Sequence, residues 1–408
     1  MSRGIRRLGG SRVRRMLRAA VYLAVAGIVV IAAYAVFVGV RRTQPITLPV
    51  PAGGRHVGRA TFDWTDTTRR DPYAPSPDTA RTVSVWVWYP AAPGAVAASG
   101  QYAPGAWSGL SFAGPAAFLE GPLATVRPHA VDGPPAARGR FPIIVLEPGM
   151  GLAAPQFTAL AEGIASEGYI VAGVTPTYSA NLTVIDGRAV RSTAGGNPPD
   201  LGSQTATALE NADVLLTTWA ADATFAAARV RILDRSGPLA GHVGVGPITY
   251  VGHSFGGAAA LQACVDDPQC AGAVDIDGTQ FGPVVRTGVR RPFLILGSDN
   301  SCVLGSCEPK DADDRSELVT AQRFLAASTG QPYRYSITGT KHFNFTDISV
   351  WYVAPPVRQL FPLGSIDGHR GLVLEEAVVT AFLARTHGAG PSDLEALTVR
   401  YPEVRRLS

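Results

Sequence analysis

Short apolar runs alternate with helix-like segments along most of the chain. Residues 81–89 alternate strictly, with Val83, Val85, Val87 and Tyr89 on one face and Ser84, Trp86 and Trp88 on the other, which predicts a strand. The same reading predicts strands at 60–66, 141–146, 169–174, 248–252, 271–276, 292–296 and 333–337, and helices at 154–167, 205–228, 256–263, 316–327 and 371–384. Strands that alternate with helices predict an α/β fold, with a mostly parallel sheet covered by helices on both faces.

The N-terminal pattern differs from the rest. Ala19 to Val40 is a run of 22 uncharged residues, long enough to cross a bilayer as a helix. Seven arginines precede the run and two follow it, which favours a cytoplasmic N-terminus and an extracytoplasmic body.

The alternative is that this run belongs to a signal peptide that is cleaved near the small residues Ala32, Ala33 and Ala35, so that the protein is secreted. The predicted organisation is a basic N-terminus (1–18), a transmembrane anchor (19–40), a linker (41–58), a catalytic domain (59–390) and a C-terminal tail (391–408).

Within the predicted domain, residues 91–140 lose all periodicity and are rich in Ala, Gly and Pro. We interpret this segment as either a cap over the site or a surface loop insertion. Its apolar part, Tyr102–Leu123, would suit an interfacial cap.

Charge and cysteine content narrow the class of protein. The net charge is +4, but residues 1–42 hold nine arginines and no acidic residue, so the body itself is acidic and no nucleic-acid partner is expected.

The four cysteines form two close pairs, Cys264 with Cys270 and Cys302 with Cys307. An exported compartment permits disulfides, and local pairing is the preferred one of three connectivities. No metal site is expected, because no histidine cluster or C-x-x-C accompanies them.

The segment 247–260 carries the strongest chemical signal. An apolar strand leads into Gly252-His253-Ser254-Phe255-Gly256, followed by Gly257 and a run of alanines. This strand–Gly-x-Ser-x-Gly–helix order is typical of the nucleophile elbow of α/β-hydrolases. Gly252 and Gly256 would relieve crowding in the tight turn. Ser254 is therefore the candidate nucleophile.

A serine hydroxyl needs a base that titrates near neutrality. Of the seven histidines, only His342 comes directly after the last predicted central strand and the turn Thr338-Gly339-Thr340, where α/β-hydrolases place the base. His369 and His387 also lie downstream, but they flank the final predicted helix. His253 lies in the elbow itself and cannot reach its neighbour's hydroxyl.

Three aspartates compete for the third position, which orients the histidine. Asp275 and Asp277 end the strand after the elbow helix, and Asp299 ends the next strand. Sites in open α/β sheets form at these carboxyl ends. The pattern alone does not separate Asp277 from Asp299.

Two backbone N–H groups should bind the oxyanion. One belongs to Phe255, after the nucleophile. The other is expected from the loop Glu147-Pro148-Gly149-Met150-Gly151 after an earlier apolar strand, where glycines on both sides of Met150 allow its N–H to point inward.

Together these residues resemble the plasma-type platelet-activating factor acetylhydrolases and their bacterial lipase relatives, over roughly residues 58–350. The matching segments are VGRATFD, VWYP, PGMGL, GYIVA, GHSFGG and HFNFTD. The resemblance implies Ser254, His342 and Asp277 as the triad and Met150 and Phe255 as oxyanion donors, while the related lipases would use Asp299 as the acid. Pro148 departs from the histidine that this family often has there, and residues 91–140 have no clear counterpart.

The resemblance implies cofactor-independent hydrolysis of short or oxidised acyl esters, including those of phospholipids. The expected partners are a small-molecule or lipid ester and, through residues 19–40, a membrane. The alternatives are a cutinase-like polyester hydrolase or long-chain lipase, and a non-catalytic anchored binding protein.

Overall fold

A ten-stranded mixed sheet forms the centre of the computed structural model, which describes residues 10–94, 100–112, 114–199, 201, 206–388 and 394–407. The strand order is β14-β13-β12-β11-β10-β6-β7-β3-β2-β5. The strands are β2 (Val57–Arg70), β3 (Ala80–Pro90), β5 (Val131–Asp132), β6 (Ile143–Glu147), β7 (Ile170–Thr175), β10 (Ile248–His253), β11 (Cys270–Ile276), β12 (Phe293–Gly297), β13 (Pro332–Ile337) and β14 (Val404–Arg406). Neighbouring strands from β7 to β13 pair in parallel, whereas β3 is antiparallel to both β7 and β2.

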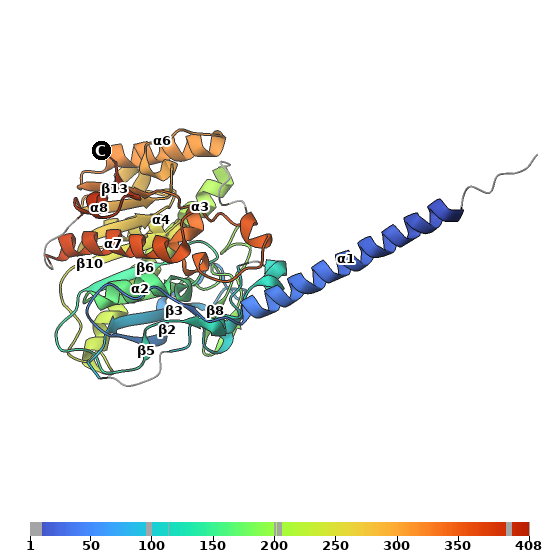
Figure 1. Ribbon diagram of the computed structural model, residues 1–408. Helices are drawn as coiled ribbons and strands as arrows, with labels where there is room; N and C mark the ends of the chain where they lie inside the picture. Colours follow the sequence, from blue (N-terminus) through green and yellow to red (C-terminus); the bar gives the residue numbers. More distant parts are fainter. Residues whose placement is uncertain are drawn as a thin grey trace, which may run out of the picture.

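Helices cover both faces of the sheet (Figure 1). They are α2 (Thr158–Ser166), α3 (Ala206–Ile232), α4 (Phe255–Asp266), α5 (Val284–Thr287), α6 (Ala312–Ala327), α7 (Gly368–His387) and α8 (Leu397–Arg400). Residues of α2 and α7 pack on the face of β3 that carries Trp86 and Trp88. Residues of α3, α4 and α6 share the opposite cluster with Val83, Val85 and Val87. The predicted alternation of β3 is therefore confirmed, and both of its faces are buried.

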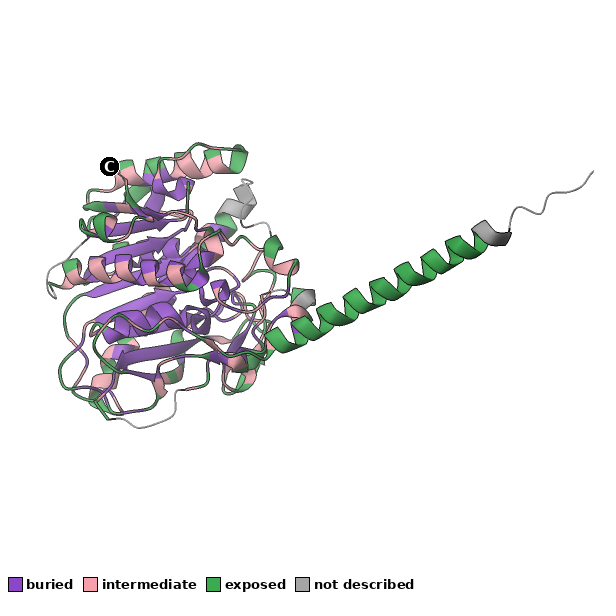
Figure 2. Ribbon diagram, viewed as in Figure 1, coloured by how far each residue is buried: buried purple, intermediate pink, exposed green. Residues whose placement is uncertain are grey.

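The helix α1 (Gly10–Arg42) projects from the body (Figure 1), and almost all of it is exposed (Figure 2). Within Val13–Arg42, the most apolar window of 18 residues has a mean hydropathy of 2.7, and only 6% of that window is buried. By length and composition it can cross a membrane, and a signal sequence would have the same properties. Residues 1–9 of the predicted basic N-terminus lie outside the described residues.

Two predicted boundaries need correction. Residues 391–408 were expected to be a tail, but β14 pairs antiparallel with β13 and extends the sheet at its edge. The linker 41–58 also belongs partly to the body: β1 (Ile46–Thr47) pairs with β4 (Val126–Arg127), Leu48 is buried, and β2 begins at Val57. Segments of two or three paired residues are too short for periodicity to reveal.

The segment 91–140 is mostly ordered and packed rather than a free surface loop. It contains short 3₁₀ helices, η1 (Gly105–Gly109), η2 (Gly114–Leu119) and η3 (Leu123–Thr125). Tyr102, Trp107 and Leu110 are buried in the same cluster as α2 and α7. Residues 95–99 and 113 of this segment lie outside the described residues.

Both disulfides join the cysteines that are neighbours in sequence. Cys264 at the end of α4 is bonded to Cys270 at the start of β11, and Cys302 is bonded to Cys307 in the loop after β12. The hairpin β8 (Thr183–Ile185) and β9 (Arg188–Val190) lies outside the central sheet.

Candidate active site

Ser254 lies in the tight turn between β10 and α4, with φ 56° and ψ −126°. A positive φ is strained for a residue with a side chain, so the surrounding backbone must hold it in place. A Cβ on Gly252 would lie 2.0 Å from the carbonyl oxygen of Gly256, and one on Gly256 would lie 2.2 Å from that of Pro148. The sequence prediction that these two glycines permit a close turn is thus matched by the geometry.

His342 joins the elbow to an acidic residue through both of its ring nitrogens. It begins η7 (His342–Phe345), in the loop after β13. Its Nε2 lies 3.0 Å from Ser254 Oγ, and its Nδ1 lies 2.9 Å from Asp277 Oδ2. Because an ionised carboxylate only accepts hydrogen bonds, Nδ1–H donates to Asp277 and Nε2 is left to accept from the serine hydroxyl.

Asp277 follows β11 at φ 53° and is 6% exposed. Its Oδ1 accepts a hydrogen bond of 2.7 Å from Ser298 N–H. Burial alone would raise the pKa of this carboxyl, but the hydrogen bond and charge of His342, with the donors Ser298 and Ser301, outweigh it and hold the pKa below its ordinary value. Asp277 is therefore ionised at neutral pH.

The other two candidate aspartates are placed elsewhere. Asp299 Oδ2 accepts from the N–H of Gly339, at 3.0 Å, in the turn that precedes His342. Asp275 is buried and accepts from Gly278 N–H and from the Gln280 amide. Burial, above all, raises the pKa of Asp275 well above its ordinary value. Neither has a hydrogen bond to His342 among the described residues.

The predicted oxyanion donors Met150 and Phe255 line the same cavity as Ser254. Phe255 is the first residue of α4, so its N–H has no acceptor within the helix. The loop that carries Met150 touches the elbow: a Cβ on Gly149 would lie 3.1 Å from Ser254 Cβ. Gly151, at φ +76°, completes the turn. This packing brings both backbone segments to the same cavity as Ser254.

His253 has a structural role that the sequence does not indicate. It is fully buried, and its Nε2 lies 3.1 Å from the carbonyl oxygen of His342. The two rings lie 4.6 Å apart, centre to centre. Burial and then the charge of His342 lower the pKa of His253 to about 3. The neutral ring therefore donates to the backbone of the His342 loop and holds it against the elbow.

The cavity at Ser254 has a volume of roughly 520 Å³. One side is apolar, formed by Met150, Leu201, Phe255 and Phe281, which pack together. The loop from β12 into α6 contributes polar and charged side chains: Asp299, Asn300, Ser301, Lys310, Asp311 and Asp314. Among the described residues, none from 91–140 lines this cavity, so the cap interpretation finds no support there.

We predict that His253 makes folding sensitive to acid. Its pKa is lower in the folded chain than the value of about 6.5 in an unfolded chain, so its contribution to stability is complete above about pH 6.5 and is lost as pH falls toward about 3. His253→Gln keeps a donor but cannot titrate. The difference in free energy of unfolding between parent and variant should shrink from pH 7 to pH 4 in chemical denaturation series. A constant difference would contradict the buried neutral ring.

Comparison with known proteins finds likeness among solved structures. No protein-family model and no curated protein matches the chain. Among solved structures, a ferulic acid esterase from Streptomyces cinnamoneus is 27% identical, with a TM-score of 0.69, over 90% of this chain and 100% of the other. This likeness supports a carboxylic-ester hydrolase of the α/β-hydrolase type. It does not single out the platelet-activating factor acetylhydrolases.

Proposed function

We propose that this protein is a serine carboxylic-ester hydrolase in which Ser254, His342 and Asp277 act as a triad. The observation that carries the proposal is the continuous series of hydrogen bonds from Asp277 through His342 to Ser254, at 2.9 and 3.0 Å, at the edge of a cavity. Geometry of this kind, rather than sequence position, defines a catalytic triad.

In the first half of the reaction, Ser254 Oγ attacks the ester carbonyl carbon while its proton passes to His342 Nε2. Asp277 stabilises the resulting imidazolium. The carbonyl oxygen becomes an oxyanion, which the N–H groups of Met150 and Phe255 would bind. The intermediate then collapses: the bond to the alcohol oxygen breaks, and the alcohol leaves with the proton from His342.

In the second half, water attacks the acyl-serine ester and gives its proton to His342. The oxyanion forms again at the same two N–H groups. Collapse breaks the bond to Ser254 Oγ, which recovers a proton from His342, and the carboxylic acid leaves. No step of this proposed mechanism uses a metal or a cofactor.

The cavity favours short or compact acyl groups. The apolar side formed by Met150, Leu201, Phe255 and Phe281 suits an acyl chain or an aromatic acid, whereas the charged β12–α6 side suits a polar alcohol. Phospholipids with short or oxidised acyl chains combine such an acyl group with a polar alcohol, and so do feruloyl esters. Feruloyl esters are also suggested by the similar structure, which is a ferulic acid esterase. The second candidate is a cutinase-like or long-chain lipase activity.

We also propose that α1 remains attached as a membrane anchor, with the N-terminus cytoplasmic and the catalytic body outside. The arginine excess before the helix supports this orientation. The two disulfides fit an extracytoplasmic body.

The variant Ser254→Ala should lose at least about 10³-fold of its turnover of p-nitrophenyl acetate, because no other hydroxyl can form the acyl-enzyme. A fluorophosphonate probe should label the parent and not the variant. Ser236→Ala, at an exposed serine, is the matched control and should behave like the parent. A folded parent that neither reacts with the probe nor hydrolyses the ester would favour a binding protein.

The two aspartates can be separated by paired amide variants. Asp277→Asn should lower kcat on the order of 10⁴-fold, because the amide no longer stabilises the imidazolium and favours the wrong tautomer. Asp299→Asn should cost less than about tenfold, since Asp299 bonds to the Gly339 backbone rather than to His342. The reverse order of losses in steady-state kinetics would identify Asp299 as the acid.

Acyl-chain preference follows from the size of the cavity. Across p-nitrophenyl acetate, butyrate, octanoate and palmitate, kcat/KM should peak at acetate or butyrate and fall at least about tenfold by palmitate. Methyl ferulate should also be hydrolysed. A maximum of kcat/KM at the palmitate ester, with a rate that rises above the critical micelle concentration of this ester, would instead support the lipase.

A further inference from the structure

Two chain segments lie side by side where α1 leaves the body. The first is the end of η2 with Glu120 and Gly121, and the second runs from Tyr352 through η9 (Val357–Leu360). Gly121 N–H donates to the Tyr352 carbonyl at 2.8 Å, and Ala354 N–H donates to the Leu119 carbonyl at 3.0 Å. We call these two segments, residues 114–121 and 352–361, the collar.

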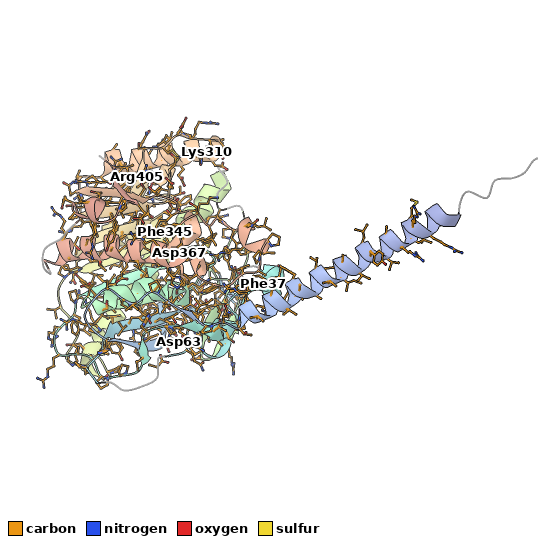
Figure 3. The ribbon with its side chains drawn as sticks, viewed as in Figure 1. Phe37, Asp63, Lys310, Phe345, Asp367 and Arg405 are labelled. Atoms are coloured by element: carbon orange, nitrogen blue, oxygen red, sulfur yellow. A yellow bond between two sulfur atoms is a disulfide. The ribbon has the colours of Figure 1, made fainter. Side chains whose placement is uncertain are left out.

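The collar contacts the last turns of α1 directly. The Tyr34 hydroxyl donates a hydrogen bond to the Pro355 carbonyl. A groove of roughly 610 Å³ lies between them, lined by Phe37 and Arg41 of α1 and by Val353 and Pro355 of the collar. Figure 3 labels Phe37 at this junction.

These contacts set the depth of the collar relative to the helix. The uncharged run of α1 ends at Val40, six residues after Tyr34. At a rise of about 1.5 Å per residue, Tyr34 lies about 9 Å below that end. If α1 crosses a bilayer along residues 19–40, Pro355 therefore lies within the outer leaflet rather than above it.

The composition of the collar suits lipid. Residues 352–361 contain no acidic residue and a single basic one, Arg358, and residues 114–121 contain one charged residue, Glu120. Glu120 is buried and accepts a hydrogen bond from Phe112 N–H at 2.9 Å, so its carboxyl does not face the surroundings of the collar. Two large apolar side chains point away from the body without a partner: Leu360 is 79% exposed and Phe118 is 68% exposed. Such side chains on two adjacent segments form a patch that water does not favour.

The backbone of the collar also suits a medium without water, in which every polar group needs an internal partner. Pro355 and Pro356 have no N–H to satisfy. The Arg358 guanidinium donates to the carbonyls of Trp351 and Ser349, at 3.0 and 2.6 Å.

We infer that the collar is a membrane-contacting surface, with Phe118 and Leu360 inserted among the outer-leaflet lipids around α1 and acyl chains filling the groove. This inference rests on the proposed anchor. The partner is the lipid bilayer itself. Arg41, at the mouth of the groove, then lies at the level of the phosphate groups.

The collar is connected to the candidate active site through aromatic contacts. The ring of Phe361 lies 4.7 Å from that of Phe112, and Phe112 lies 4.5 Å from Phe343. Phe343 is adjacent in sequence to His342, and their rings are 5.3 Å apart. The membrane contact therefore abuts the loop that holds His342, and ester substrates dissolved in the bilayer would lie close to the entrance of the cavity.

The test uses single introduced cysteines in the full-length protein, whose four native cysteines are all in disulfides. Phe118→Cys and Leu360→Cys are labelled with an environment-sensitive fluorophore and reconstituted into phosphatidylcholine vesicles. Val29→Cys, in the middle of α1, reports the anchor. Val399→Cys, 88% exposed in α8 on the far side of the body from α1 (Figure 1), reports water. Circular dichroism verifies that each variant is folded.

We expect the labels at 118, 360 and 29 to show blue-shifted emission and quenching by nitroxide-labelled lipid, and the label at 399 to show neither. Labels at 118 and 360 that match the one at 399, with 29 still quenched, would overturn the collar and leave the anchor standing. An unquenched label at 29 would overturn both. None of these readings requires ester hydrolysis, so the result is independent of the proposed catalytic activity.

Discussion

The candidate site depends on one close approach, between the turn after β10 and the loop after β6. A Cβ on Gly256 would lie 2.2 Å from the Pro148 carbonyl oxygen, so no larger residue fits there without separating the two segments. The approach holds Ser254 at a positive φ and brings Met150 and Phe255 to the same cavity. Strain at Ser254 is tolerated because β10, the strand that leads into the turn, is paired on both sides, with β6 and with β11. The positions of Ser254, Met150 and Phe255 at one cavity are thus consequences of the same packing.

The charges around this turn are consistent with a developing oxyanion. The pKa of Asp277 is held below its ordinary value, because His342 and Ser298 hydrogen-bond to this carboxylate. Glu147, at the start of the Met150 loop, is buried without a hydrogen-bond partner, and burial raises its pKa well above the ordinary value. Burial thus favours the neutral form of Glu147, and it also favours the neutral form of His253, whose pKa is lowered to about 3. Within the described part of the chain, Asp277 is the carboxylate that is hydrogen-bonded to the His342 side chain.

The sequence was sufficient for the sheet and the elbow, because periodicity and local turn chemistry are properties of neighbouring residues. The alternation of β3 and the small residues around Ser254 are visible without a structure. The sequence was not sufficient to choose between Asp277 and Asp299 as the partner of His342, since both end adjacent parallel strands. The choice depends on where the loop that carries His342 folds back. The sequence excludes His253 as the base of its neighbour but assigns it no other role, and only the structure brings its ring to the His342 carbonyl. The strand β14 was missed because its three residues acquire meaning only by pairing with β13.

The collar shows how one stretch of chain can serve two purposes. The residues after His342 first form η7, whose Phe343 packs beside the candidate base, and then continue to the apolar segment that touches α1. Because this stretch is short, His342 lies near the C-terminal end of α1. In an anchored chain, the body could therefore not turn its cavity freely away from the membrane. A flexible linker would have allowed any orientation. Here β1 pairing with β4 and the Tyr34–Pro355 contact bind the end of α1 to the body, so an anchored chain would present its site at a fixed height above the lipid surface.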